Sequence, residues 1–598
     1  MARPGFLREL RRHHVFRVAA AYAVVGWVII QVVAIIFPLL QFPDWLARVI
    51  VALALAGFPV ALVLAWAFQT PRDETNASAS VRRRSLRIGV SLGSVGVLIA
   101  ILGGVVWWYL GPIEHTLRGA PATAVAATVN PKSIAVLPLG EIGGGADGGY
   151  LGEGISEELL NALSRVPGLE VIGRTSSFRF KDSRLGARAI GRELGVRNLL
   201  SGVVQRSGQD LRVDVELDDT ATGATLWSQQ YDQKMQDLFT LEDTISDAVV
   251  KALRVRLGGI DRRELVFKGT SSPEAHDLFL RGTRLAWHTD EASLDEALAL
   301  FQQAIAVDPN YAAAWAGMAR AYINLADVYR APLSLLPAMR GAAQKAVALN
   351  PDLAEGHLLL GYIAMSYDLD FPKAKRELAL AVQLRPSLAD AHATLGLYLS
   401  RVARDHAAAR AQLETAEKLD PLNPWFPRWE SFVAIAQNDE PAAMQLAARV
   451  DRIDPGFAYN GDAVAMVDGA FGHWRACVDR YKVEHVRVSL ASPQLAVCQA
   501  HVGETAQARA ALHTLLADAQ HRYVDRTYTA AIYAALGDKS DAMAQLEQAY
   551  RDRSSHVDGI WLNPWYRSLH GDPRFEALVA RIAAGTHPPA AGADSSPW

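Results

Sequence analysis

The amino-acid sequence predicts a multi-domain protein made of three transmembrane helices, a small α/β domain and an all-α repeat solenoid. Three observations support this fold class. Apolar runs of about 20 residues come first, a mixture of strand and helix patterns follows, and a helix-pair pattern then recurs about every 35 residues. Because the chain has 598 residues, it is too long for a single hydrophobic core, and several domains are expected.

The apolar runs are residues 18–40, 49–68 and 88–110, and none of them contains a charged side chain. Each is long enough to cross a bilayer as a helix. Five arginines lie in residues 1–17 and five between the second and third runs, whereas only Arg48 lies between the first two. Arginine-rich segments stay in the cytoplasm. The sequence therefore predicts a multi-pass protein of a bacterial inner membrane, with a cytoplasmic N-terminus and periplasmic C-terminal domains.

A cleaved signal peptide is the alternative for the first apolar run, which follows a basic segment. We favour a retained helix, because the run is too long for a signal peptide and no small-residue cleavage site follows it. After the third run, residues 111–131 are rich in Ala, Pro and Thr and show no periodicity, as in a linker.

Residues 132–258 combine strand and helix patterns in the order β-α-β-α-β-β-β-α. Residues 134–139 are predicted as a buried strand, and residues 156–166 as a helix capped by Ser156. Apolar and charged side chains alternate through residues 211–218, as in a half-buried antiparallel strand, and a helix over residues 237–257 closes the unit. We expect a small mixed sheet with its helices on one face.

Residues 273–583 are predicted as a repeat array with a C-terminal cap. Five prolines are each preceded by three apolar or small residues with the same spacing. The first lies five positions before the proline, the second three positions before the first, and the third four positions before the second. The sets are Pro309, Ala304, Phe301 and Ala297; Pro351, Ala346, Ala343 and Met339; Pro386, Ala381, Leu378 and Ala374; Pro421, Ala416, Leu413 and Ala409; Pro455, Val450, Ala447 and Ala443. Small residues on a preceding helix, Gly282, Ala319, Gly361 and Gly396, allow the two helices of each pair to approach closely.

The segment after the clear repeats keeps a helical pattern in poorer phase. Aromatic residues in "WLNPWYRSLHGDPRFEALVARI" suggest a cap over the last helix, and residues 584–598 are expected to be a disordered tail. The two cysteines, Cys477 and Cys498, fall on predicted neighbouring helices. They could form a disulfide in an oxidising compartment or remain two buried thiols.

No catalytic or cofactor-binding constellation stands out, and we expect no cofactor, no bound metal and no enzymatic activity. Gly143, Gly145 and Gly148 match G-x-G-x-x-G, with Arg174 as a possible specificity residue, but Pro138 interrupts the strand and the next helix begins too late to hold a phosphate. His357 and His392 occupy equivalent repeat positions and are interpreted as packing residues. The net charge of −3 gives no electrostatic reason to expect nucleic-acid binding.

A binding site, if present, is expected on the concave side of the array, which the first helix of each pair lines. By register, the polar or aromatic residues there include Arg320, Asn324, Tyr362 and Arg401, which suit an extended peptide. A solvated helix surface is the alternative explanation for all four.

Several stretches resemble known families. The repeat sets resemble the tetratricopeptide repeat, and "KSIAVLPL", "IGRELGVRNLLSGVVQRSG" and "ATGATLWSQQYD" are similar to the TolB N-terminal-like (FlgO-like) domain. Together with "FLRELRRHHVFRVAAAYAVVGWVIIQVV", they resemble bacterial membrane-anchored proteins that carry these modules in this order. Relatives of that group can carry a nucleotide cyclase or a winged-helix domain in the cytoplasm, but only about 17 residues precede the first apolar run, too few for either domain.

The resemblance and the residues together predict an inner-membrane-anchored periplasmic scaffold. It would bind envelope proteins or peptides through the TolB-like domain and the repeat groove, without catalysis. The alternative is a signalling or regulatory membrane protein related to repeat-containing adenylate cyclases. The sequence leaves the partner and the oligomeric state open.

Overall fold

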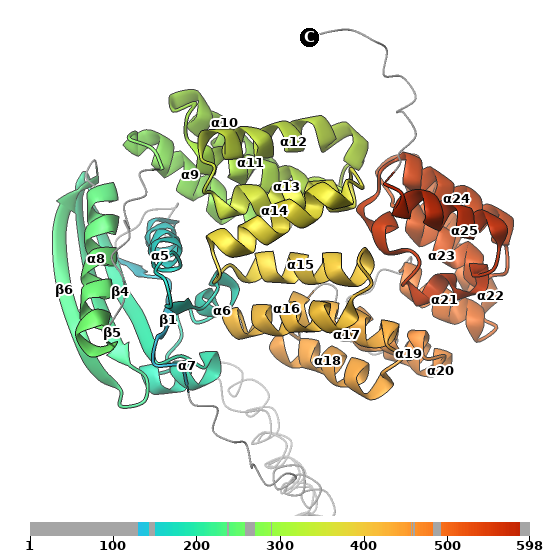
Figure 1. Ribbon diagram of the computed structural model, residues 1–598, viewed down its shortest axis with the longest axis horizontal. Helices are drawn as coiled ribbons and strands as arrows, with labels where there is room; N and C mark the ends of the chain where they lie inside the picture. The colour runs from blue at the N-terminus through green and yellow to red at the C-terminus, as the bar shows by residue number, and fades with distance from the viewer. Residues whose placement is uncertain are drawn as a thin grey trace, which may run out of the picture. The chain divides into compact units, whose positions relative to one another are not determined.

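The computed structural model divides the chain into two compact units, Met1–Ala127 and Thr128–Trp598. The structure describes residues 129–142, 150–235, 238–257, 269–288, 290–455, 457, 461–481 and 492–585. All of these belong to the second unit. They form an α/β domain (β1 to α8), a repeat array (α9 to α18) and a C-terminal block (α19 to α25) (Figure 1).

The predicted fold class is wrong in its membrane part. Among the residues described, we find no helix with the length and apolar character needed to cross a membrane. The segments 18–40, 49–68 and 88–110 on which that prediction depended lie outside the described residues. The structure instead consists mostly of a helical solenoid. The predicted inner-membrane localisation, with its periplasmic C-terminal domains, is corrected for the same reason.

The α/β domain is built on a twisted mixed sheet in the order β3-β1-β4-β5-β6, with β2 paired to β4. Strands β3 (Glu170–Val171), β1 (Ser133–Val136) and β4 (Asn198–Ser207) are parallel, and β2 (Gly140–Ile142) also runs parallel to β4. Strands β5 (Asp210–Asp219) and β6 (Ala224–Lys234) complete an antiparallel meander with β4. The strand predicted from the alternation in residues 211–218 is β5, and its Val213, Val215 and Leu217 side chains are buried in the core.

Helices cover both faces of this sheet, whereas one face was predicted. Ile134 and Val136 pack into the cluster formed with α5 (Tyr150–Leu163) and α8 (Leu238–Leu257). Ala135 and Leu137 pack on the other face with α7 (Ala187–Leu194). All four residues of β1 are buried, which is typical of a parallel strand covered on both sides.

Helix α5 begins six residues before the predicted cap at Ser156. The Ser156 hydroxyl lies inside the helix, where it donates to the Gly152 carbonyl at 2.7 Å and accepts the Leu139 amide at 2.8 Å. A Cβ at Gly152 would lie 2.2 Å from the Leu139 carbonyl oxygen, so the extra helical turn needs glycine at this position.

The predicted repeat solenoid is confirmed as a stack of helix pairs (Figure 1). The pairs are α9 (Pro273–Ala286) with α10 (Glu291–Val307), α11 (Ala312–Leu325) with α12 (Pro332–Leu349), α13 (Ala354–Ser366) with α14 (Phe371–Leu384), α15 (Ala389–Arg401) with α16 (His406–Leu419), and α17 (Trp425–Ala436) with α18 (Glu440–Ile453). Aspartate caps start four of the second helices by accepting a backbone amide of the first turn: Asp290, Asp370, Asp405 and Asp439.

The C-terminal block continues the helical pairs and then folds back onto the array. Its elements are α19 (Gly461–Ala470), α20 (Trp474–Tyr481), α21 (Pro493–His501), α22 (Thr505–Asp518), α23 (Arg526–Ala535), α24 (Lys539–Arg551), η2 (Ser555–Gly559), η3 (Pro564–Leu569) and α25 (Pro573–Ala583). One hydrophobic cluster joins Met365 and Leu378 of the third pair to Leu546 and Phe575 of this block. The block therefore packs against a repeat almost 200 residues earlier.

Helices α20 and α21 are linked through Cys477 and Cys498. The structure joins the two residues by a disulfide, with their Cα atoms 6.2 Å apart, and both side chains are buried. The bond closes a loop with a sequence separation of 21 residues. Such a cross-link stabilises a fold by restricting the unfolded chain.

We expect both cysteines of the purified chain to resist alkylation by iodoacetamide in denaturant until a reductant is added. Denaturant exposes buried thiols, so only a covalent bond protects them under these conditions. Peptide mass spectrometry before and after reduction measures this directly, and the chain has only two cysteines to follow. Alkylation of both residues without reductant would show two buried thiols instead.

Candidate functional site

The α/β domain docks onto the repeat array through the short helix α6 (Arg174–Phe178) (Figure 1). The Asp420 carboxylate at the end of α16 accepts the Ser176 amide at 2.7 Å. The Leu422 amide donates to the Ser176 hydroxyl at 2.7 Å, and the Gly173 amide donates to the Leu419 carbonyl at 2.6 Å. A Cβ at Gly173 would lie 2.6 Å from the Asp420 side chain, so the two segments are in direct contact.

Helix α5 makes further contacts with the array. The Tyr150 hydroxyl donates to Asp277 of α9 at 2.7 Å, and Arg385 donates to Asn161 at 3.1 Å. Burial, followed by the hydrogen bond to Asp277, raises the pKa of Tyr150 to about 12. These contacts hold α5 and α6 against α9 and against the ends of α14 and α16.

A cavity of about 180 Å³ lies between the two parts. Helices α5 and α6 form one wall, and α9, α11, α13 and the start of α15, together with Phe301 of α10, form the other. Its apolar lining includes Phe279, Trp287, Phe301 and Leu359. Trp287 is 41% exposed although it is large and apolar, so part of the cavity lining is open to solvent. Such a lining is typical of sites that bind an apolar side chain or a small molecule.

Charged groups surround this apolar surface. Arg174 contacts Glu157 at 3.0 Å, and its guanidinium lies 4.5 Å from the Trp287 ring. Arg320 contacts Asp390 at 3.7 Å, and both side chains are about one-third exposed. An ion pair of this length and exposure contributes little to stability. Arg320 can therefore exchange Asp390 for a ligand carboxylate at low cost.

A second cavity of about 40 Å³ adjoins the first between α5, α8, α9 and α11. His276 bridges Tyr311 and Glu242 through its two ring nitrogens, at 3.1 and 3.3 Å. Burial, reinforced by the charge of Glu242, raises the pKa of the neighbouring Glu158 to about 7. The buried Ser246 hydroxyl also lines this cavity and has no protein partner in the described part of the chain. The space suits an ordered water.

The four residues predicted for the concave groove lie in different environments. Arg320 lines the large cavity, and the Asn324 side-chain amide donates to the Ala286 carbonyl at 3.4 Å. Tyr362 packs against Tyr367 with ring centroids 6.0 Å apart. Arg401 contacts the buried Asp558 of η2 at 3.1 Å. The structure therefore places Arg320 in the cavity and both Tyr362 and Arg401 against the C-terminal block.

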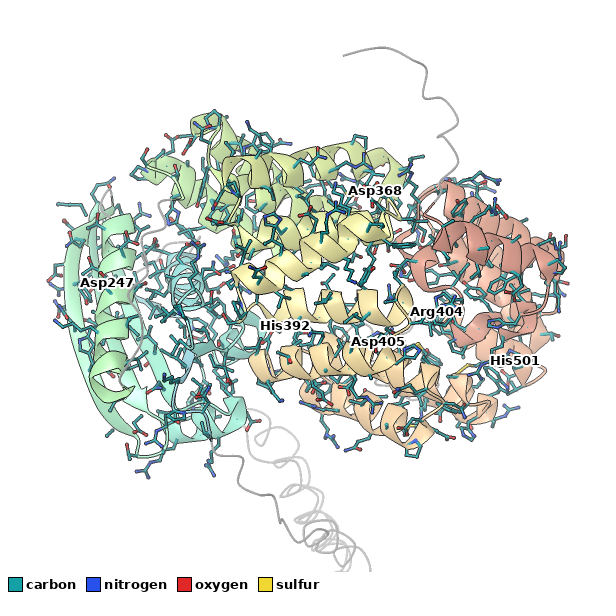
Figure 2. All side chains as sticks on the ribbon, viewed as in Figure 1. Asp247, Asp368, His392, Arg404, Asp405 and His501 are labelled. Atoms are coloured by element: carbon teal, nitrogen blue, oxygen red, sulfur yellow. A yellow bond between two sulfur atoms is a disulfide. The ribbon has the colours of Figure 1, made fainter. Side chains whose placement is uncertain are left out.

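The two repeat histidines make equivalent contacts. His357 contacts Glu377 at 2.7 Å and the Pro351 carbonyl at 2.8 Å, and His392 (Figure 2) contacts Gln412 at 2.7 Å and the Pro386 carbonyl at 2.9 Å. Each histidine thus joins the first helix of its pair to the second and to the preceding proline turn. The glycine-rich loop with Gly143, Gly145 and Gly148 lies outside the described residues.

A polar cluster brings together three side chains that the sequence did not single out: Asp327, Asp525 and His556. His556 Nδ1 lies 2.8 Å from Asp525 Oδ2, and Asp327 accepts hydrogen bonds from the Tyr367 hydroxyl at 3.1 Å and the Ser555 amide at 3.3 Å. Burial and then the charge of Asp525 raise the pKa of Asp327 to about 6. Nothing in the sequence signals this cluster, because its members are spread over more than 200 residues.

Comparisons with known proteins agree with the repeat architecture. Residues 289–331 match the tetratricopeptide-repeat family, so the chain carries tetratricopeptide repeats. A curated protein of Rhizobium meliloti (strain 1021), named "Putative adenylate cyclase 3", is 36% identical over 242 residues. That match covers 39% of this chain and 40% of the relative, so the chain spans less than half of the relative's length.

Solved structures of repeat proteins are also similar. TTC0263, a thermophilic repeat protein of Thermus thermophilus, is 19% identical with a TM-score of 0.28, over 33% of this chain and 98% of its own. YrrB, described as a repeat protein with an unusual peptide-binding site, is 17% identical with a TM-score of 0.22, over 35% of this chain and 93% of its own.

Proposed function

We propose that this chain is a non-catalytic scaffold whose tetratricopeptide repeats bind another protein, with residues 132–258 acting as a TolB N-terminal-like domain. The observation that carries this proposal is the 180 Å³ cavity between α5–α6 and the first helices of the array. The cavity combines an apolar lining with charged groups at its margin, which is the chemistry that holds an extended peptide by one apolar side chain and its neighbours.

Within this proposal, Phe279, Phe301 and Leu359 receive the apolar side chain of the partner. Arg320 forms a charge contact with the partner, because its present ion pair with Asp390 is long and partly solvated. The TolB-like domain supplies the second wall through Glu157 and Arg174, so both modules contact the same partner.

We expect a photo-crosslinker at position 320 of the full-length chain to give a reproducible adduct in cells. Arg320→p-benzoylphenylalanine places the reactive group in the cavity, and Glu296→p-benzoylphenylalanine places it on the exposed side of α10 as a matched control. The adduct should form at position 320, disappear when Ala316→Trp fills the cavity, and be absent at position 296. Equal adducts at both positions, or an adduct that survives Ala316→Trp, would contradict the proposal.

A second candidate, a signalling protein related to adenylate cyclases, is favoured by the name of the relative that is 36% identical. This hypothesis requires the purified chain to convert ATP into cyclic AMP and pyrophosphate. Chromatographic detection of cyclic AMP, retained in the Ala316→Trp variant, would replace the scaffold proposal with this one.

A further inference from the structure

Three side chains with metal-binding atoms meet where the C-terminal block contacts the second repeat. Asp327 follows α11, Asp525 precedes α23 and His556 belongs to η2. One potential ligand atom from each lies within 4.8 Å of the other two. Among the described residues, this is the one group of three or more such side chains that is close enough to share an ion.

We propose that Asp327, Asp525 and His556 form a binding site for a divalent zinc ion. Zinc binds imidazole nitrogen and carboxylate oxygen at about 2.0–2.2 Å, so two of its ligand atoms lie roughly 3–3.6 Å apart. His556 Nδ1 and Asp525 Oδ2 are 2.8 Å apart, so they need only a few tenths of an ångström of movement. The ion would replace the proton of the hydrogen bond between His556 Nδ1 and Asp525 Oδ2.

Hydrogen bonds from neighbouring groups hold both carboxylates in position. Thr527 donates to Asp525 from its amide at 2.8 Å and its hydroxyl at 2.7 Å, and the Ser554 hydroxyl donates at 2.6 Å. The hydroxyls of Tyr367 and Tyr523 donate to Asp327 at 3.1 and 3.4 Å. Partners of this kind orient the ligands of a metal ion and reduce the ordering needed when it binds.

The charges also favour a cation at this position. The Asp525 side chain is fully buried, and the nearby Arg401 is engaged with Asp558 at 3.1 Å. Two ionised carboxylates and a neutral imidazole balance one divalent ion. The His556 side chain is 44% exposed, which gives the ion a route from solvent and leaves room for a water as the fourth ligand.

The ligand types select zinc over the hard cations. Calcium takes six to eight oxygen ligands and magnesium retains most of its waters, whereas one imidazole with two carboxylates is a set that zinc accepts. A bound ion would connect the α11–α12 turn, the start of α23 and η2. It would therefore fix the C-terminal block to the second repeat, next to the groove residues Tyr362 and Arg401.

The test is a calorimetric titration of the full-length chain, stripped of metal with EDTA, with zinc chloride. We expect binding of one ion per chain, and a cobalt(II) titration should give visible absorption bands typical of a four-coordinate site. Asp327→Asn and His556→Gln should each weaken zinc binding at least about tenfold. Magnesium chloride should give no binding.

His473→Gln is the matched control. His473 contacts Glu440 at 2.8 Å in a half-exposed pair, and no third ligand joins them among the described residues. This variant should bind zinc as the unmodified chain does. Circular dichroism and the melting temperature identify any variant that fails to fold, and the two ligand substitutions then serve as checks on each other. Absence of zinc binding, or binding unchanged in both ligand variants, would overturn the proposal.

Discussion

Replacing Gly361 by valine should lower the free energy of unfolding by about 3 kcal/mol. Gly361 lies on α13 where this helix contacts α14, and a Cβ there would lie 2.6 Å from Leu378 Cγ and 3.1 Å from the Leu378 amide nitrogen. Neither atom can move away independently, because Leu378 is fully buried and its amide belongs to the helix. The helices must therefore separate, which exposes apolar surface along the whole pair.

Gly341→Val is the control for this prediction. Gly341 is an exposed residue of α12, and a Cβ at this position would meet nothing within 4 Å. Since valine favours a helix slightly more than glycine does, we expect a change within about 0.5 kcal/mol. Urea denaturation followed by circular dichroism compares the two variants, and hydrogen exchange localises the loss to α13 and α14. Equal destabilisation by both substitutions would show that close packing at Gly361 is not the cause.

The sequence predicted the repeat units because the contacts within a unit are local. Gly361 meets Leu378 and Gly396 meets Leu413, in each case across a single turn between two helices. Gly282 meets Phe301 in the same way in the first pair, so the small residue and the apolar residue leave a period in the sequence. The aspartate caps and the prolines between units have the same local origin.

The contacts that assemble the units could not be predicted in this way. Asp420 and Ser176 are 244 residues apart and meet once, so they leave no period. Arg401 was placed in the groove by its register within one unit, and in the structure it pairs with Asp558 of the C-terminal block, 157 residues further along the chain. Register within a unit contains no information about such a contact, because it depends on how the later segments fold back onto the array.

Two predictions were wrong, and each has its own physical cause. The apolar runs at residues 18–40, 49–68 and 88–110 were predicted as membrane spans from their length, their lack of charge and the arginines beside them. These runs lie outside the described residues, among which no helix is long and apolar enough to cross a membrane. The one-sided helix layer was predicted from the order of strands and helices along residues 132–258. That order does not show that β1 is covered on both sides, as its four consecutive buried residues require.

Lowering the pH from 7.5 to 5 should strengthen the contact between the α/β domain and the repeat array through Asp420. Burial raises the pKa of this carboxyl from 3.8 to about 6, although its hydrogen bonds to Ser176 and Asn423 oppose the shift. Between these two values the folded chain binds a proton that the unfolded chain does not bind. The stabilising contribution is therefore full below about pH 4 and is lost as the pH rises through about 6. A shift of this size corresponds to at most about 3 kcal/mol.

Asp420→Asn isolates this contribution, because asparagine keeps the shape of the side chain and does not titrate. The melting temperature of the full-length chain should rise on acidification by more in the unmodified protein than in this variant. Hydrogen exchange of the Gly173, Ser176 and Leu422 amides reports the same contact directly. Asp308→Asn is the control, because Asp308 ends α10 in the same way that Asp420 ends α16. The Asp308→Asn variant should keep the pH dependence of the unmodified chain. If the melting temperature of Asp420→Asn depends on pH as that of the unmodified chain does, the Asp420 carboxyl does not hold the two parts together. The docking would then depend on the backbone hydrogen bond from the Gly173 amide to the Leu419 carbonyl and on the contacts of α5.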